Sequence, residues 1–154
     1  MRVAGIDPGV DGAVAMIDTD SGMVGVTDLP TGPHGVDPVA LQELLQGWGV
    51  RAVYLEDNRA MGRNGSLANF SMGRSVGLIV ATVLLSNCSL WRVKPGQWQK
   101  AVGLGQIPAA SRKEASRMRA REMYPEMNDS LKRKRDHNRA EALLIATYAR
   151  TGPA

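Results

Sequence analysis

Three acidic residues stand beside apolar segments of this 154-residue chain, where a charge is costly unless something compensates it. Asp7 follows "RVAGI", Glu56 follows "VYL", and Glu141 opens the apolar segment "ALLIA". Each has an ordinary explanation when taken alone, as a turn residue, a solvated strand end or a helix cap. Taken together, they fit carboxylates that converge at one edge of a sheet and hold a cation between them.

The residue types favour a hard divalent cation, Mg²⁺ or Mn²⁺, which takes oxygen ligands. The single cysteine, Cys88, excludes an internal disulfide and a multi-cysteine metal site. Acids on separate elements can hold two such ions about 3.5–4 Å apart, a spacing that stabilises both the attacking and the leaving oxygen in phosphodiester hydrolysis. The pattern is therefore compatible with a site for two divalent cations.

These acids must be positioned by regular elements, and the apolar spacing with its glycine and proline punctuation predicts nine of them. The expected strands are 2–7, 12–18, 22–28, 51–57 and 90–95, and the expected helices are 39–48, 66–85, 111–124 and 138–150. This order predicts an α/β fold with a mixed five-stranded sheet, in which a three-strand antiparallel meander continues into parallel strands flanked by helices. We expect residues 1–154 to form a single domain.

Charge is distributed unevenly along the chain. Residues 1–90 carry five Arg and nine Asp or Glu, a net charge of −4, whereas residues 91–154 carry fourteen Lys or Arg and six acids, a net charge of +8. A cationic run is often only a solvated face, but an excess this large favours a polyanionic partner, most commonly nucleic acid. The candidate DNA-binding cations are Arg59, Arg63, Arg74, Lys94, Arg112, Lys113, Lys132, Arg133, Lys134, Arg135 and Arg139.

Other features predict a folded protein of a reducing compartment, the cytoplasm of a bacterial or phage-infected bacterial cell. The first residues are strand-like and show no export signal. The longest apolar run, 76–85, is too short to span a bilayer, so no membrane partner is expected. The lone cysteine suits a cell interior in which thiols stay reduced.

Five stretches of the sequence resemble one known family, in the family's order and over nearly the whole chain. They are "GIDPGVDGAVA", "VYLED", "GRSVG", "VKPGQWQKAVGLG" and "DHNRAEALLIATYA". The chain resembles the RuvC-type Holliday junction resolvases, in particular the short versions encoded by bacteriophages, within the RNase H-like nuclease superfamily. "GIDPG" alone would be weak, because actin-like ATPases also open with an Asp-Gly hairpin.

This resemblance implies a homodimeric two-metal endonuclease that cuts opposed strands of a four-way DNA junction and needs no nucleotide cofactor. By position, Asp7 would bridge two Mg²⁺ or Mn²⁺ ions, Glu56 would be the ligand from the second strand, and Glu141 the ligand from the last helix. We expect the dimer to use the apolar helix 66–85, with the side around Leu78, Val80 or Leu85 facing the second copy.

One position departs from the family pattern. Members of the family commonly place a further acid three residues before the last one, where this chain has Asn138, preceded by His137 and Asp136. On an ideal helix Asn138 and His137 lie within about 60° of Glu141, while Asp136 is roughly 140° away. Asp136 is expected to precede the first turn, from which its carboxylate can swing toward the cluster. We therefore favour Asp136 as the fourth catalytic and metal-binding acid, because a carboxylate serves Mg²⁺ better than an amide or an imidazole.

The sequence is also compatible with other functions. The same fold and chemistry would serve a nuclease for other branched DNA or structured RNA, and Asn138 leaves room for a junction-binding protein that has lost catalysis. An actin-like ATPase is disfavoured, since it needs two domains around its nucleotide. In the loop 57–65, Met61 is a candidate wedge between bases, although an idle methionine is the simpler interpretation.

Overall fold

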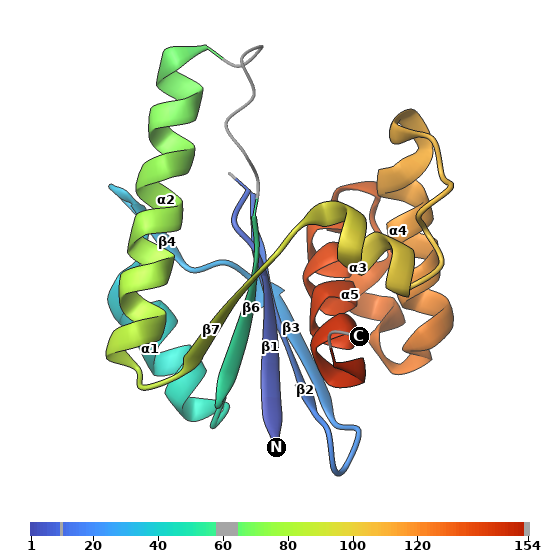
Figure 1. The fold of residues 1–154 in the computed structure, drawn as a ribbon, viewed down its shortest axis with the longest axis horizontal. Coiled ribbons are helices and arrows are strands. Elements are labelled where there is room, and N and C mark those ends of the chain that lie inside the picture. Colours follow the sequence, from blue (N-terminus) through green and yellow to red (C-terminus); the bar gives the residue numbers. More distant parts are fainter. Residues whose placement is uncertain (10, 58–64, 153–154) are drawn as a thin grey trace.

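The computed structural model describes residues 1–9, 11–57 and 65–152, which form one five-stranded sheet between two layers of helices (Figure 1). The strands are β1 (Arg2–Asp7), β2 (Ala13–Asp18), β3 (Val24–Asp28), β6 (Ala52–Glu56) and β7 (Ser89–Val93). Their order is β3-β2-β1-β6-β7, with β1 and β3 antiparallel to β2, and β6 parallel to both β1 and β7. The mixed sheet predicted from the sequence is confirmed.

Helices cover both faces of the sheet, with α1 and α2 on one side and α3 to α5 on the other (Figure 1). Their bounds are α1 (Pro38–Gly47), α2 (Ser66–Leu85), α3 (Pro95–Ala101), α4 (Ala109–Met123) and α5 (His137–Thr151). The shorter elements are the hairpin strands β4 (Thr31–Gly32) and β5 (Gly35–Val36) and the 3₁₀ helices η1 (Pro125–Leu131) and η2 (Lys134–Asp136). The hairpin and α3 were not predicted.

The strand alternation divides the core into two apolar layers. Ala4 and Ile6 of β1 pack in the layer with α1 and α2, whereas Val3 packs in the layer with α5. The central strands are buried on both faces, as their continuous apolar sequences indicate. The carboxyl ends of β1 and β6 therefore emerge side by side from a rigid core.

Helix α5 lies in direct contact with β1, and a glycine makes this possible. A Cβ atom at Gly5 would overlap the carbonyl oxygen of Ala142 and the amide nitrogen of Ala146. Only glycine leaves room for two backbones to approach this closely. Glu141, one residue before Ala142, is thereby placed beside the strand end that carries Asp7.

We expect Gly5→Ala to lower the free energy of unfolding by about 2–3 kcal/mol, because the added methyl meets helix backbone that cannot rotate away. Urea unfolding monitored by circular dichroism measures this change. Gly47→Ala is the matched control, since a Cβ there meets nothing within 4 Å. Equal stability of the two variants would show that α5 does not depend on this contact.

Helix α2 has an unusual surface for a single chain. It is the one helix among the described residues whose length and composition alone would allow it to cross a membrane, and only 17% of its apolar window is buried. Phe70, Leu84 and Leu85 are 68%, 57% and 74% exposed. The side of α2 that faces away from the sheet is therefore apolar and uncovered within this chain.

Candidate active site

The parallel pairing of β1 with β6 brings two of the predicted acids to one edge of the sheet. Ile6 is aligned with Leu55, so Asp7 and Glu56 end adjacent strands, and both are buried, at 5% and 7% exposure. Glu141, in the first turns of α5, lines the same pocket. The other residues lining this acid pocket are Gly9, Asp11, Pro95, Gln99, Lys113, His137 and Asn138.

The electrostatics of the acid pocket show that the carboxylates interact. Burial, then the charge of Glu56, raises the pKa of Asp7 to about 6. Burial, then the charges of Asp7 and Glu56, raises the pKa of Glu141 to about 8. The ammonium of Lys113 opposes both pKa shifts. Three acids that repel one another in a buried pocket attract a cation.

Two neighbours fix the orientation of these carboxylates. The indole Nε1 of Trp98 donates a hydrogen bond of 2.8 Å to Oε1 of Glu56, and the backbone amide of Gly9 donates one of 3.0 Å to Oδ1 of Asp7. Trp98 is fully buried in α3. The sequence did not reveal this contact, because α3 was not predicted and no local pattern links Trp98 to Glu56.

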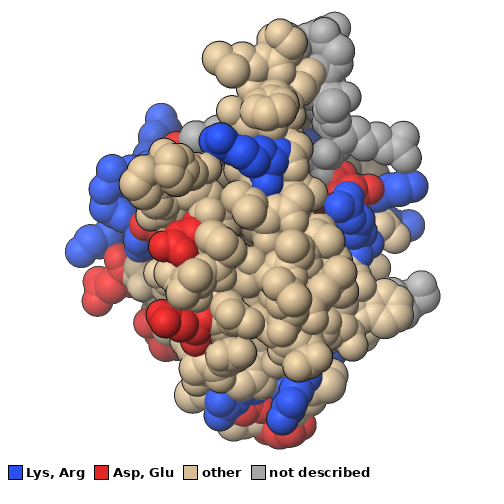
Figure 2. Space-filling model, turned by 90° about the vertical axis from the view of Figure 1, so that its left-hand side faces the viewer, with Lys and Arg blue, Asp and Glu red and all other residues tan. Residues whose placement is uncertain are grey.

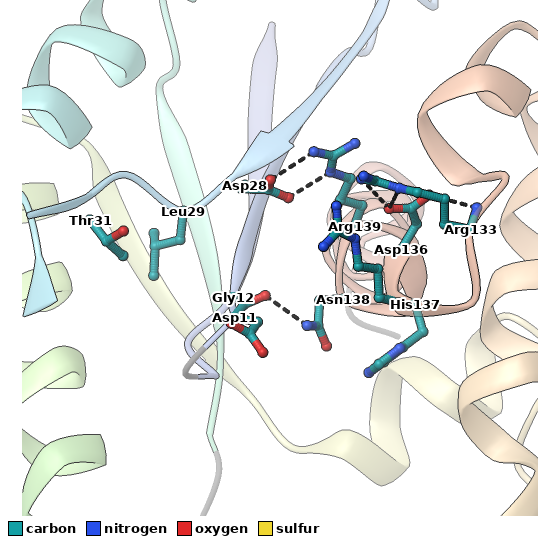
Figure 3. A pocket seen from close by; sticks show the side chains of 11 residues that line it. Asp11, Gly12, Asp28, Leu29, Thr31, Arg133, Asp136, His137, Asn138 and Arg139 are labelled. Carbon is teal, nitrogen blue, oxygen red and sulfur yellow. Dashed lines mark hydrogen bonds and ion pairs between the residues drawn. The ribbon is translucent and has the colours of Figure 1, made fainter.

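Asp136 does not lie with the other three predicted acids. It precedes α5 as expected, but it is 3% exposed and lines a neighbouring pocket, the arginine pocket of Figure 3, and not the acid pocket. Its Oδ1 accepts bonds of 3.0 and 2.7 Å from the Arg133 guanidinium, and its Oδ2 accepts one of 2.7 Å from the Arg133 amide. The predicted swing toward the acids does not occur in this structure, because Arg133 holds the carboxylate.

The two alternatives to Asp136 do line the acid pocket. The amide nitrogen of Asn138 donates a 2.7 Å hydrogen bond to the carbonyl oxygen of Asp11, joining α5 to the turn after β1 (Figure 3). Nδ1 of His137 lies 3.2 Å from the carbonyl oxygen of Lys134. As a donor in that bond, Nδ1 would leave Nε2 as the acceptor nitrogen of the ring. Asn138 and His137 are thus better placed than Asp136 to act as the fourth residue of the site, beside the three acids.

The predicted cations fall into distinct settings. Arg139 forms a bidentate ion pair with Asp28, with hydrogen bonds of 2.6 and 2.7 Å. The guanidinium of Arg112 donates a hydrogen bond to the carbonyl oxygen of Ile107. Lys94, Lys113, Lys132, Lys134 and Arg135 are exposed, and Lys113 and Arg135 line the acid and arginine pockets respectively. Arg74 is exposed beside Gly35, whereas Arg59 and Arg63, like Met61, lie outside the described residues.

The carboxylate oxygens of the acid pocket suit a hard cation, but the side chains do not lie close enough together to coordinate one. Among the described residues, no three His, Cys, Asp or Glu side chains stand in an arrangement that would hold a single ion. Ionised Asp7, Glu56 and Glu141 would repel one another in this pocket, since the charges of neighbouring acids raise the pKa values of Asp7 and Glu141. A bound cation would remove that repulsion and draw the carboxylates together.

We expect the stability of the metal-free protein to fall as pH rises. Because folding raises the pKa values of Asp7 and Glu141 above their ordinary values of 3.8 and 4.5, the folded state holds extra protons, and the stability they confer is lost between pH 4 and about 8. Thermal unfolding in a chelator at pH 5, 7 and 9 measures this loss. Glu141→Gln, which cannot ionise, should show a shallower fall, and identical pH profiles would contradict the coupling.

The chain is an α/β protein with a mixed five-stranded sheet of order β3-β2-β1-β6-β7. No protein-family model matches the sequence, and no curated protein sequence matches it. Among solved structures, the RuvC of Thermus thermophilus in complex with a Holliday junction substrate matches with a TM-score of 0.70 at 22% identity. A second Thermus thermophilus RuvC structure matches with a TM-score of 0.64 at 22% identity. Each match covers 100% of this chain and 98% of the RuvC chain, so the chain has the RuvC fold over its whole length.

Proposed function

We propose that this protein is a metal-dependent endodeoxyribonuclease that resolves four-way DNA junctions by paired nicks. The observation that carries the proposal is the convergence of Asp7, Glu56 and Glu141 in one pocket at the carboxyl edge of the sheet. The fold supports it, because a protein of the same fold is known in complex with a Holliday junction substrate.

Asp7, Glu56 and Glu141 are the residues that would hold the metal. Two Mg²⁺ or Mn²⁺ ions bound there would supply an activated water and stabilise the leaving oxygen of the phosphodiester. The three acids are coupled by charge, since Glu56 raises the pKa of Asp7, and both Asp7 and Glu56 raise the pKa of Glu141. Trp98 and Gly9 orient the carboxylates, and His137 or Asn138 would complete the set.

DNA binding in this proposal rests on the cations without a carboxylate partner in the described structure. Lys132, Lys134 and Arg135 are exposed around η2, next to the start of α5. Arg133 forms an ion pair with Asp136, and Arg139 forms one with Asp28. These two arginines therefore contribute less to DNA binding than the three exposed cations do. The phosphates on either side of the cut would meet the three exposed cations.

A panel of matched substrates tests the substrate class. We expect Mg²⁺-dependent cleavage of a four-way junction to exceed cleavage of a three-way junction, a flap and a linear duplex by about tenfold or more, since recognition depends on branched shape. Equal rates on the panel would favour the broader RNase H-like nuclease. Tight junction binding without any cut would favour a protein that has lost catalysis.

We also propose that the active species is a homodimer that pairs through α2. The exposed residues Phe70, Gly73, Gly77, Ala81 and Leu84 follow helical spacing along one stripe. A Cβ at either glycine meets nothing within 4 Å, so no other element among the described residues requires these glycines. Small residues at such spacing permit close approach of a second helix. Figure 2, which views this side of the molecule, shows a broad area without charged side chains.

This exposed stripe is not the side of α2 that the sequence predicted to face the second copy. Leu78 and Val80 pack against the core of their own chain, whereas Leu85 is exposed as expected. A junction has two equivalent scissile phosphates, and cutting both within one complex requires two sites related by a two-fold axis. One copy of this chain supplies one acid pocket among its described residues.

We expect Ala81→Arg to convert the dimer to a monomer and to abolish paired cutting, because it places a charge in the centre of the stripe. Light scattering and sedimentation near the cleavage concentration, with and without a junction, measure the assembly state. Gln46→Arg adds the same side chain at an exposed site on α1 and should leave the dimer intact. A wild-type monomer that still makes paired nicks would overturn the dimer proposal.

A further inference from the structure

A second, apolar pocket lies on the α2 side of the acid pocket. It has a volume of about 460 Å³ and is formed by the turn after β1, the β4–β5 hairpin and the first half of α2. Its apolar walls include Pro8, Leu29, Val36, Leu67 and Met72. Pockets of this size and character commonly hold small planar ligands.

The few polar groups of the apolar pocket are hydroxyl groups and one positive charge. Thr31, Ser71 and Ser75 bring hydroxyl groups, each a donor and an acceptor, and Arg74 brings a guanidinium. None of the described residues that line it is acidic. The pocket therefore suits a ligand with an apolar face, hydrogen-bonding edges and an attached negative charge.

The apolar pocket adjoins the acid pocket. Gly9 lines both of them, and its amide donates a hydrogen bond to Asp7. Asp11, His137 and Asn138 line both the acid pocket and the arginine pocket of Figure 3. The arginine pocket also shares Leu29 and Thr31 with the apolar pocket, so each of the three pockets adjoins the other two.

We propose that the apolar pocket binds an unstacked nucleobase of the strand being cut, from a nucleotide adjacent to the scissile phosphate. This inference rests on the proposed function. A strand whose phosphate sits at Asp7, Glu56 and Glu141 can continue past Gly9, which lines both pockets. There it meets a cavity with apolar walls for the faces of the base and with hydroxyl and guanidinium groups for its edges. Enzymes that do chemistry on a DNA base extrude it into a pocket of this kind, with apolar walls for its faces and hydrogen-bonding groups for its edges.

The alternative occupant, a segment of a second protein copy, is less well matched. The exposed stripe proposed for the dimer lies at Phe70, Gly73, Gly77 and Ala81, none of which lines the apolar pocket. The cavity is therefore separate from that stripe, and its cationic, acid-free lining fits the nucleic acid strand.

The fluorescence of 2-aminopurine tests the inference directly. The probe replaces, one at a time, the bases within two nucleotides of the cleavage position of a four-way junction, and the wild-type protein is added in Ca²⁺. Leaving the stack raises 2-aminopurine fluorescence, and no aromatic side chain among the described lining residues would quench it. We expect a severalfold rise at one position adjacent to the scissile phosphate. No rise at any position would overturn the inference.

Filling the pocket should remove this signal. Ser71→Phe places a ring inside the cavity, and Ala68→Phe, at an exposed position on its rim, serves if the first variant does not fold. We expect loss of the fluorescence rise and roughly tenfold weaker junction binding, the size of one lost base contact. Gln46→Phe on α1 adds the same ring at an exposed site away from these pockets and should change neither.

An abasic junction separates a base pocket from a general packing effect. With the base removed at the responsive position, Ser71→Phe should bind as tightly as wild type, because no base is left to exclude. A tenfold loss that persists on the abasic junction, or a change of assembly state in the variant, would overturn the inference. Failure of the wild-type protein to bind or cut any junction would instead reject the proposed function on which the inference rests.

Discussion

Asp7→Asn, Glu56→Gln and Glu141→Gln are each expected to lower the rate of Mg²⁺-dependent junction cleavage by about 10³-fold or more. The neutral side chains keep the shape of the acids and remove the charge that holds the ions. Residues that act as one unit lose nearly the whole activity when any one is changed, so a double variant should be scarcely worse than a single one. Single-turnover cleavage of a labelled junction measures the rates.

Two controls separate chemistry from folding and binding in these variants. Glu43→Gln removes an exposed acid of α1 and should leave the rate unchanged. Junction affinity measured without divalent ions should stay within about threefold of wild type or improve, since a negative charge beside the DNA has been removed. Full activity in any one of the three variants would remove that residue from the site.

Replacing Lys132, Lys134 and Arg135 together by Gln is expected to weaken junction binding by about 10²-fold at moderate salt. Each neutralised phosphate releases counterions, so the slope of log affinity against log salt should decrease by roughly 0.9 for each lost contact. The three side chains are exposed and lie beside the start of α5, the helix that carries Glu141. Fluorescence anisotropy over a salt series measures both quantities.

The matched control for this experiment is Arg51→Gln with Arg150→Gln, which removes exposed cations away from η2. Its salt slope should equal that of wild type. An unchanged slope in the triple variant would show that the cationic run is only a solvated face. Arg133 is left out of the set because its guanidinium is engaged by Asp136.

The parts of this fold that were predictable from sequence are those with a strong local signal. β1, β6 and α5 have long apolar segments, and their acids stand at the segment ends, so parallel pairing of β1 and β6 was enough to place Asp7 beside Glu56. The β4–β5 hairpin escaped prediction because its strands have two residues each, too few for periodicity. The seven residues of α3 are likewise too short to show an apolar face.

The details of the site depended on contacts between residues far apart in sequence. The bond from Trp98 to Glu56 spans 42 positions, and that from Asn138 to Asp11 spans 127. No spacing rule reveals such pairs. The suitability of a carboxylate for Mg²⁺ favoured Asp136, but the guanidinium and the backbone amide of Arg133 both bind that carboxylate. Competition from a local cation decided where the side chain points.

A supercoiled plasmid that extrudes a four-way cruciform tests the central claim most directly. Two sites acting within one complex cut both opposed strands before the protein dissociates, so the circle passes straight to linear DNA. We predict linear product in Mg²⁺, with symmetric nicks mapped to opposed strands of the cruciform, and no cutting in a chelator. Accumulation of singly nicked circles, or equal cutting of a plasmid without the cruciform, would contradict junction resolution by this protein.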